Sequence, residues 1–217
     1  MLAAEALGTS FLLAIVVGSG IMAERLAGGN VAIALLANTL ATGAGLTVLI
    51  LTFGAVSAAH FNPVVTLAEA IEGRMSGKLA IGYVVAQISG AFAGVAAAHG
   101  MFGERVFAYS LHMRAGWPQI ASEFVATFGL LLVIRGVTRS RPAATPFAVG
   151  AYITAAYWFT ASTSFANPAV TLARAFTPTF AGIRPIDAPG FIAAEIAGAI
   201  AALLFSRWLF CETALSR

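Results

Sequence analysis

Charged side chains are scarce in this sequence. Only 10% of its 217 residues are Asp, Glu, Lys or Arg, while 59% are apolar and the mean hydropathy is +0.89. Soluble domains carry about 25% charged residues, so a water-soluble protein is excluded. The net charge of +3 comes from basic residues spread over several polar breaks rather than from one cluster. We therefore expect a lipid bilayer as partner and no nucleic acid.

Cysteine and clustered histidine are almost absent. The single cysteine, Cys211, excludes an internal disulfide and a multi-cysteine metal site. His60, His99 and His112 lie far apart in the sequence, and no nucleophile has an evident base beside it. Because catalysis needs a converging set of groups, we expect neither an enzyme nor a bound metal or cofactor.

Long apolar runs, by contrast, recur along the whole chain. A membrane helix needs about 20 apolar residues to cross the hydrocarbon core. The first run contains Glu5 and follows no basic segment, which favours a first span over a signal peptide. Six spans are predicted: residues 2–22, 31–53, 79–99, 120–135, 145–160 and 191–209.

Basic residues indicate how these spans are oriented. Arg135, Arg139 and Arg141 crowd one short connection that contains no acidic residue. Positive charge in short loops marks the cytoplasmic side. We therefore expect a multi-pass protein of the inner (plasma) membrane with both termini in the cytoplasm.

The two halves of the chain resemble each other. Residues 62–68 (NPVVTLA) recur as residues 167–173 (NPAVTLA), and the segments around Glu5 and Gln87 recur around Glu123 and Glu195. Each half has three spans, so the halves must enter the membrane in opposite directions. The sequence predicts one domain, residues 1–217, made of inverted repeats 1–110 and 117–217.

Each Asn-Pro pair predicts the start of a short helix. Asn is a favoured N-cap and Pro a favoured first helical residue, so helices begin at Asn62-Pro63 and Asn167-Pro168. At about nine to ten residues, each would span roughly half the membrane. Two half-helices of opposite direction would place their N-termini and both Asn amides around a central pore, where positive helix ends repel cations.

These features together resemble the aquaporin and aquaglyceroporin family. The resemblance rests on the boxes Asn62-Pro63-Val64 and Asn167-Pro168-Ala169, on His60 before the first box, and on Glu5 and Glu123 within spans. It implies an all-α membrane protein with six transmembrane helices and two half-helices in an inverted repeat. It also implies a homotetramer with one pore per subunit. Glu5, Glu123 and His60 are implied to be buried residues with structural roles.

The resemblance also locates a selectivity filter, which departs from the usual pattern. By distance from the two Asn residues, its positions are Thr42, Ala155, Ser164 and Val170, where the last replaces the usual arginine. All four are small and uncharged, which predicts a wide filter without arginine. The set is most similar to the filter of bacterial aquaglyceroporins associated with arsenic resistance. That resemblance implies passage of small neutral solutes: metalloid acids or arsenicals, glycerol-like polyols and water. Arg174, one turn beyond Val170, is expected to extend to the outer interface.

Other functions remain open at this point. A divergent water channel would share the same boxes. A proton-coupled solute transporter could use Glu5, Glu123 and Glu195 to carry protons, because ionisable groups inside spans are often functional. We favour a structural role for Glu5 and Glu123, as hydrogen-bond acceptors for irregular backbone, and for His60, although His60 could also form a pH-sensitive gate.

Overall fold

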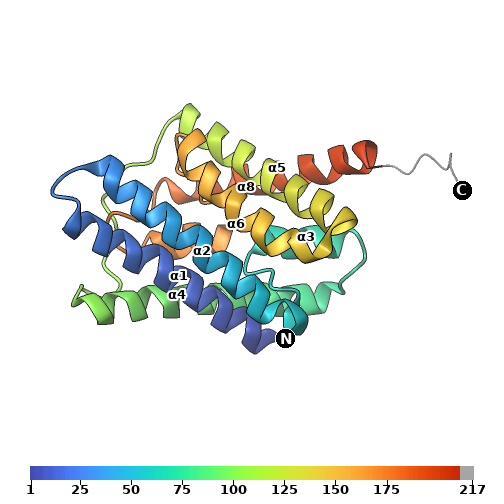
Figure 1. Ribbon diagram of the computed structural model, residues 1–217, viewed down its shortest axis with the longest axis horizontal. Coiled ribbons are helices and arrows are strands. Elements are labelled where there is room, and N and C mark those ends of the chain that lie inside the picture. The colour runs from blue at the N-terminus through green and yellow to red at the C-terminus, as the bar shows by residue number, and fades with distance from the viewer. Residues whose placement is uncertain (211–217) are drawn as a thin grey trace, which may run out of the picture.

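The computed structural model describes residues 1–210, which contain helices and no strand. Cys211 lies outside the described residues. The helices are α1 (Leu2–Leu26), α2 (Val31–Ser57), α3 (Pro63–Ile71), α4 (Gly77–Phe102), α5 (Trp117–Ser140), η1 (Pro142–Ala144), α6 (Thr145–Phe159), α7 (Pro168–Arg174) and α8 (Ala188–Leu209). This order confirms the predicted all-α fold, with α3 and α7 as the half-helices (Figure 1).

The long helices suit a lipid environment. Five of them, α1, α2, α4, α5 and α8, are long and apolar enough to cross a membrane, while α6 has only 15 residues. Their outward faces expose large apolar side chains, such as Leu36, Leu40 and Leu51 on α2. Such a surface is stable only against lipid or another apolar surface.

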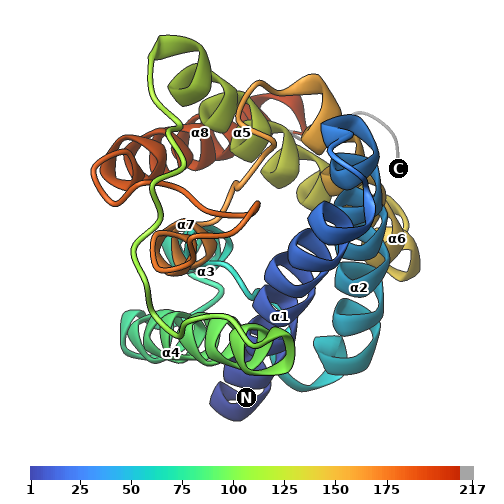
Figure 2. The same cartoon turned by 90° about the vertical axis from the view of Figure 1, so that its left-hand side faces the viewer.

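The two halves of the chain pack in the same way. Helix α1 packs against α4 in the first half, as α5 packs against α8 in the second, and α2 meets α6 between the halves. The half-helices α3 and α7 touch each other and lie between α4 and α8 (Figure 2). Helix α1 begins and α8 ends at the same end of the molecule, on the right of Figure 1.

Glycine allows the closest helix crossings. A Cβ atom on Gly90 of α4 would lie 2.2 Å from the Ala6 carbonyl oxygen of α1. At the matching place in the second half, a Cβ on Gly198 of α8 would lie 2.5 Å from the Phe124 oxygen of α5. Small residues let helix backbones approach in membranes, where van der Waals packing drives association. These crossings hold α4 and α8 close enough to support the half-helices.

Candidate functional site

Asn62 and Asn167 cap the half-helices and tie the two halves together. Asn62 Oδ1 accepts a hydrogen bond from Val64 N at 3.0 Å, and Asn167 Oδ1 accepts from Ala169 N at 3.0 Å. Each amide also donates across the molecule: Asn62 Nδ2 to the Ala166 oxygen at 2.7 Å, and Asn167 Nδ2 to the Phe61 oxygen at 2.8 Å. The two helix N-termini therefore meet at one place inside the protein.

The loops before the half-helices adopt the same unusual backbone conformation. Left-handed φ angles occur four, three and one residues before each Asn: 62°, 51° and 49° before Asn62, and 63°, 51° and 47° before Asn167. None of these residues is glycine, and each left-handed residue costs roughly 1–2 kcal/mol. Such conformations persist only where surrounding contacts impose them.

Glu5 and Glu123 supply those contacts. Glu5 is fully buried on α1 and accepts hydrogen bonds from the backbone N–H groups of His60 and Phe61, at 3.0 and 2.8 Å. Glu123, fully buried on α5, accepts from Phe165 N and Ala166 N at 2.9 and 2.7 Å. Each carboxylate thus pairs N–H groups that would otherwise be left without partners in the membrane interior.

A cavity of about 240 Å³ runs past this meeting point. One water needs roughly 10–15 Å³ of such space, so the cavity can hold several waters or a small polyol. Apolar side chains of α1, α2, α5 and α6 form one wall, and the left-handed loops with both Asn residues form the other. Its lining extends from Glu69, Thr138 and Thr145 at one end to Arg174 at the other.

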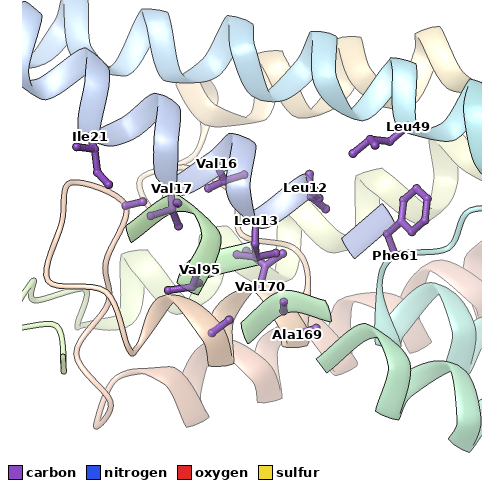
Figure 3. Packing of buried hydrophobic residues seen from close by; sticks show 14 of the residues in the cluster. Leu12, Leu13, Val16, Val17, Ile21, Leu49, Phe61, Val95, Ala169 and Val170 are labelled. Carbon is purple, nitrogen blue, oxygen red and sulfur yellow. The ribbon is translucent and has the colours of Figure 1, made fainter. Parts of the chain in front are cut away.

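Three of the four expected filter residues line this cavity. Thr42, Ser164 and Val170 are 3%, 3% and 5% exposed and border the same space. Val170 also packs with Leu12 and Leu13 of α1 (Figure 3). The cavity wall at Val170 is therefore apolar.

The fourth filter prediction, Ala155, is wrong. Ala155 is exposed on α6, whereas Ile153 and Tyr157 are buried and line the cavity. Ile153 and Tyr157 share one face of the helix, and Ala155 lies about 200° round the helix from each. Tyr157 therefore occupies the place expected for Ala155, with its hydroxyl 3.4 Å from Thr42 Oγ1.

Arg174 does not extend to the outer interface, contrary to expectation. It is 2% exposed and lines the cavity. Its Nε donates to the Ala181 oxygen, and its Cζ lies 3.4 Å from the centre of the Phe165 ring. An arginine can extend to the interface only where no other group blocks its path. Here the contacts with Phe165 and with the Ala181 carbonyl hold the Arg174 side chain inside the protein.

Arg114 is a second buried arginine, to which the sequence pattern assigned no role. It holds the second left-handed loop: Nε donates to the Gly182 oxygen at 2.8 Å and a terminal nitrogen to the Ser162 oxygen at 3.0 Å. Burial lowers the pKa of Arg114 to about 10, so it remains charged at neutral pH.

The prediction that His60 is buried is also wrong. His60 is half-buried, because its ring borders the cavity. Its Nδ1 lies 3.0 Å from Thr66 Oγ1, and its ring lies 5.3 Å from that of Tyr83. The ring thus connects the first loop to α3 while one side faces the cavity.

Comparisons with known proteins agree with this architecture. The family model described as "Major intrinsic protein" matches residues 1–163. Aquaglyceroporin AqpS of Rhizobium meliloti (strain 1021) is 56% identical over 206 residues, which cover 95% of this chain and 88% of AqpS. Aquaglyceroporin-3 of Trypanosoma brucei brucei is 31% identical over 173 residues, covering 69% of this chain and 56% of that protein.

A solved structure is similar over nearly the whole length. The X-ray structure of the aquaglyceroporin from Plasmodium falciparum has a TM-score of 0.74 and covers 97% of this chain and 96% of its own. Its sequence identity to this chain is 19%, so the similarity concerns the fold.

Proposed function

The chain belongs to the major intrinsic protein family, whose aquaglyceroporins are channels and not enzymes, and we propose that it is a passive transmembrane channel for small neutral solutes. Metalloid acids or arsenicals, glycerol-like polyols and water are the proposed solutes. The observation that carries the proposal is the cavity beside Asn62 and Asn167, where two helix N-termini meet.

The proposed transport step uses hydrogen bonds alone. Each Asn amide donates one N–H to the opposite loop, which leaves its second N–H for an oxygen of the passing solute. Carbonyl groups of the left-handed loops accept the hydroxyl hydrogens of the solute. Apolar residues on the opposite wall offer no competing partner, so the solute moves along one line of polar groups. Positive helix ends at the centre repel cations.

The proposed filter lies between Thr42, Tyr157, Ser164 and Val170. It has no arginine at position 170, so an apolar side chain borders the solute there. Removing a bulky cation from that position leaves room for solutes larger than water, which supports passage of polyols and metalloid acids.

The proposal extends to assembly and orientation. The channel is one domain formed by inverted repeats 1–110 and 117–217, and the exposed apolar helix faces suit a homotetramer within the bilayer. We place both termini in the cytoplasm and the protein in the inner (plasma) membrane. The supporting feature is the group of arginines near the end of α5, which includes Arg135 and Arg139.

Reconstitution into liposomes tests the function directly. Stopped-flow measurements would compare the entry of water, glycerol and arsenous acid into vesicles with and without the protein. Rapid entry of all three, without any dependence on a proton gradient, is expected. Entry of water alone would indicate a divergent water channel, and accumulation driven by a proton gradient would indicate a coupled transporter.

The variant Val170→Arg tests the filter. Arginine at this position would narrow the cavity and reduce the entry of glycerol and arsenous acid more than that of water. Unchanged entry of every solute would show that Val170 does not border the transport path.

A further inference from the structure

Arg174 is the cation nearest to the proposed filter along α7. It follows Val170 by four residues on the same half-helix, so the two side chains share a face and both line the cavity. Helix α7 runs outward from the centre, which places Arg174 about 6 Å beyond Val170 along the helix axis. A solute leaving the level of Val170 on the side away from Asn167 therefore meets Arg174.

The guanidinium of Arg174 is held in place but is not neutralised. The Ala181 oxygen accepts its Nε–H, and its Cζ lies 3.4 Å from the centre of the Phe165 ring. Within residues 1–210, Arg174 forms no ion pair, and no hydrogen bond of its terminal nitrogens is found. These terminal N–H groups belong to a side chain that is 98% buried and borders the cavity. Because a buried polar group needs a partner, the cavity contents must provide one.

Arg114 is a useful contrast to Arg174. Its Cζ lies 5.0 Å from the centre of the same Phe165 ring, but its Nε donates to the Gly182 carbonyl and one terminal nitrogen donates to the Ser162 carbonyl and the Thr163 hydroxyl. It does not line the cavity. Arg114 therefore fixes the loop and the ring, and Arg174 presents its terminal N–H groups to the solute path.

We propose that Arg174 is the specificity-determining cation of this channel and replaces, one helical turn further out, the cation that position 170 lacks. Its terminal N–H groups donate to the oxygens of neutral hydroxylated solutes, and its charge, which no ion pair within residues 1–210 neutralises, repels cations at the outer entrance. Because the cation lies beyond the filter, the solute path stays wide at Val170. The inference rests on the proposed channel function.

The test uses the full-length protein in liposomes with two readouts. One readout is the stopped-flow entry of glycerol and arsenous acid, and the other is the leak of H⁺ and K⁺ detected by an internal pH dye under an applied gradient. The variants are Arg174→Leu and Arg174→Lys, with Arg105→Gln as a control because Arg105 is an exposed arginine in the connection after α4. Folding of each variant is checked by size-exclusion chromatography.

Arg174→Leu is expected to raise the cation leak roughly tenfold or more, because the outer charge is lost. Arg174→Lys keeps the charge and is therefore expected to keep the cation leak low. It is expected to slow the entry of glycerol, since an ammonium group offers a different donor geometry. Arg105→Gln is expected to match the wild type. A leak in Arg174→Leu equal to that of the wild type would overturn the inference.

A double variant separates a charge effect from a structural one. Val170→Arg combined with Arg174→Leu restores a cation one turn inward and is expected to reduce the leak again. If Arg174 only supports Phe165, the added arginine would leave the leak high, and that result would overturn the inference. Should Arg174→Leu fail to fold, the same comparison is made with Arg174→Gln. Failure of the wild type to pass any neutral solute would instead refute the channel function itself.

Discussion

Gln87 and Glu195 contact equivalent threonines of the two half-helices, but the threonine accepts the hydrogen bond in the first half and donates it in the second. Gln87 Nε2 donates to Thr66 Oγ1 at 2.9 Å, whereas Thr171 Oγ1 donates to Glu195 Oε1 at 2.6 Å. Gln87 also donates to Glu5 at 2.8 Å, so every nearby carboxylate oxygen of the first half has a partner. In the second half, Glu195 Oε2 has no partner among the described residues, although Glu123 lies beside it.

Glu195→Gln is therefore expected to keep the channel folded and active. The glutamine oxygen can still accept from Thr171, and its amide can donate toward Glu123 as Gln87 does toward Glu5. Since the change removes one buried carboxyl from beside another, we expect thermal stability in detergent to stay equal or to rise by about 1 kcal/mol. Fluorescence-detected size-exclusion chromatography after heating measures this change.

The matched control is Glu195→Leu, which leaves the Thr171 hydroxyl without its acceptor and is expected to lower stability. A folded Glu195→Gln protein that no longer passes glycerol would contradict a purely structural role. That outcome would favour a mechanism in which the Glu195 carboxyl carries protons.

Gly90→Ala is expected to destabilise the contact between α1 and α4. Its new methyl group would lie 2.2 Å from the Ala6 backbone oxygen, so the helices must move apart. Overpacking of this kind costs about 1–3 kcal/mol. Gly100→Ala on the same helix is the control, because a Cβ there has no atom within 4 Å. Equal melting temperatures for the two variants would show that the crossing is looser than described.

Tyr157→Ala tests which face of α6 borders the solute path. Removing the ring beside Thr42 widens the cavity, so the entry of glycerol is expected to rise several-fold relative to that of water. Ala155→Val changes the exposed side of the same helix and is expected to leave both rates unchanged. The opposite pattern in stopped-flow assays would restore Ala155 as the filter residue.

The ion pairs of Glu72 lead us to expect that the folded protein is less stable in acid. Glu72 ends α3 and forms ion pairs with Arg135 of α5, with Arg74 and with Arg207 of α8. Burial pushes the pKa of Glu72 upward, but the hydrogen bond from Arg135 and the charges of the three arginines outweigh burial, and the pKa lies below its ordinary value of 4.5. A lowered pKa stabilises the folded state above the ordinary value, and this contribution is lost as pH falls through the folded pKa.

We therefore expect the melting temperature of the protein in detergent to fall when pH decreases below about 4.5. Glu72→Gln should lower stability at pH 7 by about 1 kcal/mol and weaken the acid dependence. Glu24→Gln is the control, since Glu24 is exposed on α1 and forms no ion pair within residues 1–210. An acid response of Glu72→Gln identical to that of the wild type would show that other groups cause it.

The sequence alone determined the membrane class, the order of the helices and the starting points of both half-helices. These features depend on local chemistry: a long apolar run must cross the bilayer as a helix, and Asn followed by Pro begins one. The repeated segments also placed Glu5 and Glu123 near equivalent irregular loops, where each now accepts two backbone hydrogen bonds.

Only the tertiary structure decided which side chains face the cavity. Helix α6 is apolar on every side, so its sequence has no period that separates Tyr157 from Ala155. Packing of α6 against α2 places Tyr157 beside Thr42. Arg174 was equally ambiguous, because a long cationic side chain can reach the interface or turn inward. Phe165 and the Ala181 carbonyl, which are brought together by folding, provide the contacts that hold it inside.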